Sequence, residues 1–210
     1  MKSLFVMSCV LIVLCAAAVG VMLLGIVIID ALFTKYQKQS KKKLDEARQQ
    51  LQVTCCRIYK PGTRKIAKVL KEGNNGPAIV YAANCFIDWL PKNAVIIPVP
   101  SHNGRATYMR EVADKIVEKR KDITVADICR GRERKPWCEM KKKGTDKHIL
   151  SVFNYFGFKI KSRKLLRKEN PIIWIDNVIH TGTTLAVATS LIQGSEAMVF
   201  ADAREAGWLK

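Results

Sequence analysis

One stretch of the chain, Ile172 to Leu185, combines residue types that suit sugar and phosphate chemistry. Its apolar start, Ile172 to Ile175, predicts a buried strand that ends at Asp176 and Asn177. After two apolar positions the chain reads His180, Thr181, Gly182, Thr183 and Thr184, and a segment with helical spacing follows. A carboxylate accepts hydrogen bonds from ribose hydroxyls, and N–H groups and hydroxyls that converge at the start of a helix suit a phosphate. This order of residues predicts a site for a sugar phosphate.

The rest of the chain alternates between strand and helix patterns. Short apolar or β-branched runs predict strands at residues 53–59, 94–97, 123–128, 172–175 and 197–201, and residues 152–158 also have a strand-like composition. Apolar residues at helical spacing predict helices at residues 63–71, 77–90, 109–120 and 183–192. This alternation predicts an α/β fold, with a mainly parallel sheet flanked by helices. Ligands bind such sheets beyond the carboxyl ends of the strands, so we expect the loop Pro98–Arg105 to lie near the segment 176–184.

The N-terminal region differs from the rest in having no charged residue between Leu4 and Ile29. A helix over these positions would measure about 39 Å, against a hydrocarbon core of about 30 Å. A cleaved signal peptide is the alternative, although its apolar region normally spans about 7–15 residues. We expect a transmembrane anchor over residues 1–33, a helical juxtamembrane stalk over 34–52, and one domain over 53–210.

Lysines follow this apolar segment on its C-terminal side. They are Lys35, Lys38, Lys41, Lys42 and Lys43, whereas the N-terminal side has Lys2 and the α-amino group. The positive-inside bias therefore predicts a single-pass membrane protein whose C-terminal domain is cytoplasmic. The lysines of the stalk either contact anionic headgroups or belong to a solvated linker.

The part of the chain that follows the first thirty residues carries the whole net charge of +18. This excess indicates a polyanionic small molecule, nucleic acid or anionic lipid as partner. Eight basic residues lie between Arg130 and His148: Arg130, Arg132, Arg134, Lys135, Lys141, Lys142, Lys143 and Lys147. Long polar segments of this kind are often functional loops. The seven cysteines show no C-x-x-C spacing, which argues against a zinc ribbon or a thioredoxin-type site and for reduced thiols.

The sequence from Asp176 to Thr184, DNVIHTGTT, resembles the phosphoribosyl pyrophosphate (PRPP) signature of type I phosphoribosyltransferases. That signature has two acids, two apolar residues and a Thr-Thr-Gly-x-Thr turn. Three further segments resemble, in the same order, parts of the ComF-like branch of the family: Tyr59–Gly62, Val95–Pro100 and the basic segment from Arg130. The resemblance covers roughly Tyr59 to Ala203.

The resemblance implies a role for each matching residue. Asp176 and Asn177 would be catalytic residues that bind the ribose hydroxyls, and His180, Thr181, Gly182, Thr183 and Thr184 would hold the 5′-phosphate. Pyrophosphate would meet Pro100, Ser101, His102, Arg105, Arg130 and Arg132, with Arg134 as a further candidate. Mg²⁺ would be carried by the PRPP oxygens without a cage of protein ligands. Transfer of the phosphoribosyl group to a nitrogenous acceptor would release pyrophosphate, whose charge the basic groups and Mg²⁺ would stabilise.

The chain departs from the family pattern at two positions of the signature. Asn177 stands where the second acid is usual and His180 where the first Thr is usual, and the zinc ribbon that often precedes ComF-like domains is absent from this sequence. An alternative function is therefore a catalytically inactive ligand sensor, or an accessory protein that handles nucleic acid at the membrane, as the resemblance to DNA-uptake systems suggests. Nucleic acid and a second copy of the chain, as a homodimer, stay open as partners.

Overall fold

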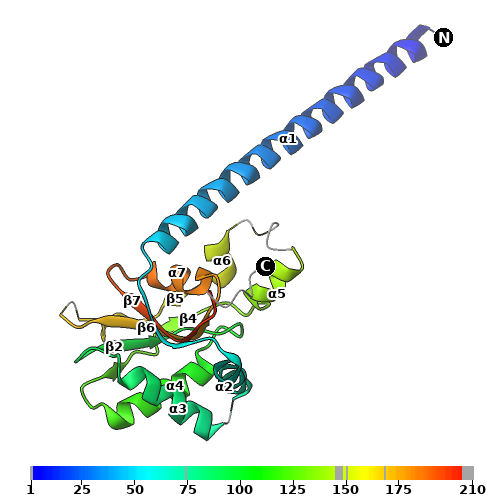
Figure 1. The fold of residues 1–210 in the computed structure, drawn as a ribbon. Coiled ribbons are helices and arrows are strands. Elements are labelled where there is room, and N and C mark those ends of the chain that lie inside the picture. The colour runs from blue at the N-terminus through cyan, green and yellow to red at the C-terminus, as the bar shows by residue number, and fades with distance from the viewer. Residues whose placement is uncertain (1, 74, 145–148, 150, 168, 205–210) are drawn as a thin grey trace.

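The computed structural model describes residues 2–73, 75–144, 149, 151–167 and 169–204, with backbone alone for residues 2–18 and Cys138. A five-stranded parallel sheet with the strand order β1-β7-β6-β2-β3 forms its centre (Figure 1). Its strands are β1 (Val53–Ile58), β2 (Val95–Pro98), β3 (Thr124–Val125), β6 (Ile172–Ile179) and β7 (Glu196–Asp202). A separate antiparallel pair joins β4 (Cys129–Arg130) to β5 (Lys159–Ile160). The predicted α/β fold with a mainly parallel sheet is confirmed.

Helices cover both faces of the sheet (Figure 1). One face carries α2 (Pro61–Glu72), α3 (Gly76–Ile87) and α4 (Thr107–Lys119), and the other carries α6 (Val152–Phe156), α7 (Thr183–Thr189) and the end of α1 (Lys2–Gln49). The short helix α5 (Trp137–Lys142) follows β4. Each face has its own apolar cluster: Ile173 and Ile175 pack with Phe86 on the first, and Trp174 with Leu185 on the second. The sheet is therefore the middle layer of three.

Strand β6 is the central strand and is buried on both faces, which accounts for its uninterrupted apolar start. It pairs with β2, where Ile97 lies opposite Trp174, and with β7 on its other side. The fully buried Trp174 donates from Nε1 to Ser195 Oγ at 3.0 Å. The strand was expected to end at Ile175, but it continues to Ile179 because β7 extends alongside it as far as Asp202.

The chain leaves β2 and β6 in opposite directions across the sheet. From β2 it passes through α4 to β3, and from β6 it passes through α7 to β7, with the two helices on opposite faces. Because β2 and β6 are neighbours, their carboxyl ends border the switch point of the sheet. Open parallel sheets bind ligands at this point. The fold thus brings the loop after β2 and the turn after β6 to the same edge.

Helix α1 is continuous, and its two halves have different surroundings. From Val19 it is long and apolar enough to cross a membrane, judged by length and composition, and its large apolar side chains between Val19 and Phe33 are exposed. Near its C-terminal end Leu44 is only 5% exposed and packs in the cluster beside α7. Ser40 Oγ lies 3.2 Å from Ser151 Oγ at the start of α6. The stalk predicted over residues 34–52 is thus helical, but its last turns pack on the domain instead of standing apart from it.

Two of the predicted strands differ in the structure. Residues 152–156 form helix α6, because Ser151 Oγ accepts from the backbone N–H of Asn154 at 3.4 Å and Gly157 ends the helix with φ 56°. Only Lys159 and Ile160 of the following residues pair as a strand. In the predicted strand 123–128, only residues 124–125 join the main sheet.

The buried position of Leu44 generates a stability prediction. Leu44→Ala should lower the free energy of unfolding by about 2 kcal/mol, because the apolar contact of α1 with α7 is lost. Urea unfolding of the full chain in detergent, followed by tryptophan fluorescence, measures this. Leu32→Ala, at a position 60% exposed on the same helix, is the matched control and should change little. Equal effects of the two variants would show that α1 does not contribute to the domain's stability.

Candidate functional site

Asp176 lies within β6, near the carboxyl edge of the sheet, and is half-buried, whereas the sequence predicted it just after the end of the strand. Its Oδ1 accepts from the backbone N–H of Asn177 at 2.7 Å. Burial raises the pKa of this carboxyl to about 6, against the opposing effects of that hydrogen bond and of the positive charges of Lys71 and Arg134. Burial also raises the pKa of Tyr108, and the charge of Asp176 adds to this rise. This edge therefore brings together the carboxylate of Asp176, the positive charges of Lys71 and Arg134, and the phenol of Tyr108.

The turn after β6 is held by its own hydroxyls. Thr181 Oγ1 and Thr183 Oγ1 lie 2.8 Å apart, and Gly182 adopts the left-handed conformation with φ 70°. Thr183 is only 1% exposed, so its hydroxyl lies inside the turn, whereas Thr181 and Thr184 keep part of their surface accessible. The turn therefore presents backbone and the side chains of Thr181 and Thr184, but not that of Thr183, to a ligand.

His180 precedes this turn and packs edge-on against Tyr59, with ring centroids 5.8 Å apart. Burial lowers the pKa of His180, and the nearby positive charge of Lys71 lowers it further. The imidazole is therefore neutral at pH 7 and offers a hydrogen-bond donor rather than an additional cation.

Asn177 is predicted to share the ribose hydroxyls with Asp176, but the structure does not bring it there. Its side chain has no exposed surface and points to the face covered by α2, where Nδ2 donates to the carbonyl of Ala67 at 2.8 Å. Successive residues of a strand point to opposite faces, which is why adjacent residues of the motif separate. Asn177 therefore ties β6 to α2, and Asp176 alone offers its side chain.

The loop after β2 is held by hydrogen bonds among its own residues. Asn103 Oδ1 accepts from Ser101 Oγ at 2.7 Å and from the Arg105 backbone N–H at 3.0 Å. Gly104 has φ 78°, and a Cβ there would lie 2.5 Å from the carbonyl oxygen of Gly131. Pro100 is buried, whereas His102 and Arg105 are exposed. Of the predicted pyrophosphate residues in this loop, Ser101, His102 and Arg105 thus keep accessible surface.

Arg134 joins this loop to the segment that follows β4. Its Nη1 donates to the carbonyl of Ser101 at 2.8 Å, and its backbone N–H donates to the carbonyl of His102 at 2.8 Å. The guanidinium lies over the Phe156 ring, 4.5 Å from the centroid. Burial lowers the pKa of Arg134, whereas the charge of Asp176 raises it. Arg134 therefore fixes the loop and places its charge near Asp176.

The other basic residues of the segment 130–148 are arranged differently. Arg130 is paired with Asp127, with Nη2 3.0 Å from Oδ2, so its charge is largely engaged within the protein. Arg132 is exposed and its aliphatic stem lies against Gly157. Lys141, Lys142 and Lys143 are exposed, while Lys147 and His148 lie outside the described residues. Of the two predicted pyrophosphate residues in this segment, Arg132 is exposed, whereas Arg130 is paired with Asp127.

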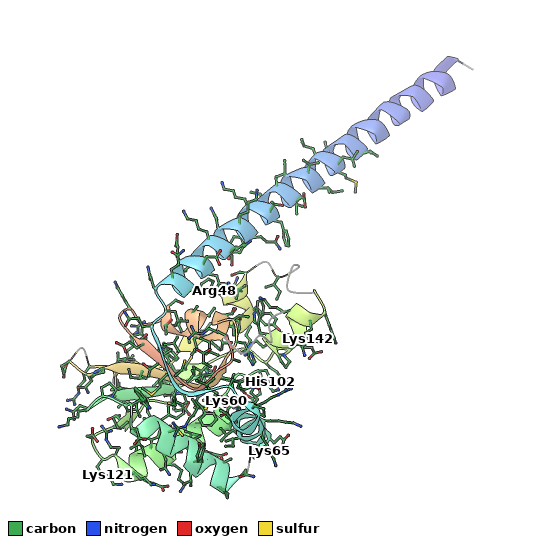
Figure 2. The ribbon with its side chains drawn as sticks, viewed as in Figure 1. Arg48, Lys60, Lys65, His102, Lys121 and Lys142 are labelled. Carbon is green, nitrogen blue, oxygen red and sulfur yellow. The ribbon has the colours of Figure 1, made fainter. Side chains whose placement is uncertain are left out.

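Three residues at or near the turn were missed by the sequence analysis. Arg48 Nη2 donates to Thr183 Oγ1 at 2.5 Å, and Figure 2 shows Arg48 where α1 meets the domain. The other two are Lys71, at the end of α2, and Tyr108, at the start of α4. All three lie on helices with ordinary helical patterns, far from Asp176 in sequence, so no local signal marks them.

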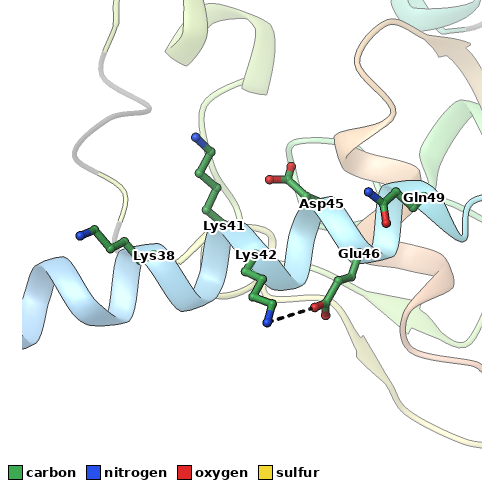
Figure 3. Close-up of a pocket in the computed structure, with 6 residues that line it drawn as sticks. All are labelled: Lys38, Lys41, Lys42, Asp45, Glu46 and Gln49. Atoms are coloured by element: carbon green, nitrogen blue, oxygen red, sulfur yellow. Dashed lines mark ion pairs between the residues drawn. The ribbon is translucent and has the colours of Figure 1, made fainter.

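Two surface hollows lie away from this edge. One, of about 480 Å³, is lined by residues of α1 alone: Lys38, Lys41, Lys42, Asp45, Glu46 and Gln49 (Figure 3). A single helix supplies one wall and cannot enclose a ligand. The other, of about 430 Å³, is lined by residues that include Asn93 and Asp122 and lies where β2 begins, at the opposite edge of the sheet.

Among the residues that the structure describes, no three His, Cys, Asp or Glu side chains gather as a metal centre. At the edge near the turn, the carboxylate of Asp176 offers oxygen atoms, the type of ligand that Mg²⁺ prefers. No protein-family model matches the chain, and no curated protein matches its sequence. The geometry of the sheet edge that carries Asp176 is therefore the basis for the function proposed below.

The contacts of Arg134 generate a second stability prediction. Arg134→Gln should cost about 2–4 kcal/mol, because the carbonyl of Ser101 loses a charged donor and the Phe156 ring loses its stacked cation. Arg134→Lys should recover little of this, since an ammonium cannot stack and reach the carbonyl together. Urea unfolding measures both variants, and the exposed Arg105→Gln is the control, expected within about 0.5 kcal/mol of wild type. An Arg134→Gln variant with the same free energy of unfolding as wild type would contradict the role of Arg134 in holding the loop.

The raised pKa of Asp176 predicts how stability depends on pH. The folded protein holds this proton up to a pKa of about 6, above the ordinary value of 3.8, so ionisation destabilises the fold as the pH rises through this interval. Asp176→Asn should match wild type below pH 4 and exceed it by about 2 kcal/mol above pH 7. Urea titrations at several pH values test this, and a difference that does not vary with pH would contradict it.

Proposed function

We propose that the protein binds PRPP, or a closely related sugar phosphate, as a phosphoribosyltransferase-like protein anchored to a membrane by α1. The observation that supports this most is the placement of Asp176 and the turn His180–Thr184 at the carboxyl end of β6, facing the loop after β2 across the switch point. Parallel sheets bind ligands at this place, and the residue types are those that a phosphorylated pentose needs.

Each part of the edge suits one part of the ligand. Asp176 would accept hydrogen bonds from the ribose hydroxyls, and the backbone of the turn with Thr181 and Thr184 would hold the 5′-phosphate. The accessible groups of Ser101, Arg105 and Arg132 would approach the pyrophosphate. Mg²⁺ bound to the pyrophosphate would neutralise its charge as it leaves, if a nitrogenous acceptor attacks C1 of the ribose.

A second candidate is ligand sensing without turnover. The orientation of Asn177 favours it, because its amide is engaged with Ala67 and Asp176 stands as a single acid. A single carboxylate can bind a ribose hydroxyl, but the site then has less negative charge to stabilise a cationic ribose centre. Nucleic-acid handling is favoured less, since Arg130 and Arg134 direct their guanidinium groups to partners within the protein.

The composition and exposure of α1 support the membrane anchor. The apolar side chains from Val19 to Phe33 are exposed, and Lys35, Lys38 and Lys41 follow on the C-terminal side. This arrangement suits a single-pass anchor with the domain in the cytoplasm.

Calorimetric titration of the full chain in nanodiscs with PRPP and Mg²⁺ tests the proposal. Wild type should bind, and Asp176→Asn should weaken binding at least roughly tenfold, because hydrogen bonds to a charged acceptor are lost. Asp88→Asn removes the same charge from an exposed position after α3 and should bind as wild type does. Absence of Mg²⁺-dependent binding, or equal affinities of wild type and Asp176→Asn, would reject the proposal.

The same protein, incubated with PRPP, Mg²⁺ and a panel of nitrogenous bases, separates the two candidates. Release of pyrophosphate with one base would establish a transferase. Binding without release for every base would favour the ligand sensor.

A further inference from the structure

Helix α1 forms part of the wall behind the candidate phosphate turn. Leu51, just after the helix, lies against Gly182, where an added Cβ would be 3.4 Å from Leu51 Cδ2. Leu44 is buried beside α7, and Ser40 bonds to Ser151 at the start of α6. These contacts come from two successive turns of the helix and from the residue that follows its end, so they fix both its rotation and its position along the domain.

A chain of side-chain contacts leads from α1 into the turn. Arg48 Nη2 donates to Thr183 Oγ1 at 2.5 Å, and Thr183 Oγ1 lies 2.8 Å from Thr181 Oγ1. Thr183 is 1% exposed, so solvent cannot replace Arg48 as its donor. The other contact of the guanidinium, Nη1 to Asp45 Oδ1 at 3.5 Å, is long and lies on the same helix. The bond to Thr183 is therefore the polar link from Arg48 to the domain.

This link sets the conformation of the residues proposed to hold a phosphate. Thr183 Oγ1 accepts from Arg48 and also shares a hydrogen bond with Thr181 Oγ1, in which either hydroxyl can donate, and together these two contacts hold the rotamers of both side chains. Without Arg48 the buried hydroxyl of Thr183 would lose a charged donor, and both side chains would be free to rotate. Ordering the turn in advance reduces the entropy that a ligand must lose on binding.

We propose that Arg48 is a positioning residue through which α1 orders the phosphate turn, so that docking of α1 and occupancy of the turn are linked. This inference rests on the proposed function. The linkage is reciprocal: a ligand in the turn strengthens the docking of α1, and a docked α1 raises the affinity for the ligand. The helix that carries the candidate membrane span thus takes part in the ligand site.

A double-mutant cycle on the full chain in nanodiscs tests the link. Ribose 5-phosphate probes the phosphate turn alone, and pyrophosphate with Mg²⁺ probes the other end of the site. Arg48→Gln and Thr183→Val should each weaken ribose 5-phosphate binding roughly tenfold, and the double variant should be no weaker than either single variant. Pyrophosphate affinity should stay within about twofold of wild type. Arg48→Lys, which can still donate to Thr183, should recover most of the affinity.

Lys42→Gln is the matched control, since it removes a positive charge from an 82% exposed side chain of the same helix and should leave both affinities unchanged. Additive losses in the double variant, or equal losses for both probes, would overturn the inference, because Arg48 would then act independently of Thr183 or on the whole fold. If wild type binds ribose 5-phosphate and Arg48→Gln binds it equally well, the inference alone fails. If wild type binds neither ribose 5-phosphate nor PRPP, the proposed function fails with it.

Discussion

The pairing of β6 with β2 on one side and β7 on the other is the constraint on which the candidate site depends. Because the chain leaves β2 and β6 in opposite directions, the connections that follow these two strands diverge at this edge, which is where parallel sheets bind ligands. The full burial of Trp174 and Ile175 fixes the register of β6, and a slip by one residue would turn the side chain of Asp176 to the other face. The position of a single carboxylate is thus set by the packing of apolar residues before it.

Two partly buried arginines hold the loop and the turn at this edge. Arg134 holds the loop after β2 through the carbonyl of Ser101 and stacks on Phe156, so it joins this loop to α6. Arg48 holds the turn after β6 through Thr183. In each case a guanidinium donates to a polar group of the loop, which a hydrophobic contact could not satisfy. The exposed basic residues of the same segments, such as Lys142, keep their charge at the surface and add to the positive field around the domain.

Helix α1 has two different surroundings along its length. Its large apolar side chains from Val19 to Phe33 are exposed, whereas its last turns belong to the apolar cluster beside α7. A rigid helix that docks directly on a domain holds that domain at a fixed distance and orientation, unlike a flexible linker. Lys38 and Lys42, which lie between these two parts of the helix, are exposed (Figure 3).

The amino-acid sequence was enough to predict the layers of the fold and the edge of the sheet where the candidate site lies. Uninterrupted apolar runs such as Ile172–Ile175 belong to strands buried on both faces, and helical spacing as in Met109–Ile116 belongs to the covering helices, because burial imposes these periods locally. Which residues meet at this edge could be seen in the folded protein alone. Asn177 turns away from Asp176 because a strand alternates its faces, and Arg48 and Lys71 approach the turn and Asp176 from helices distant in sequence. Contacts between residues this far apart in sequence depend on how the helices and strands pack, and no local pattern in the sequence predicts them.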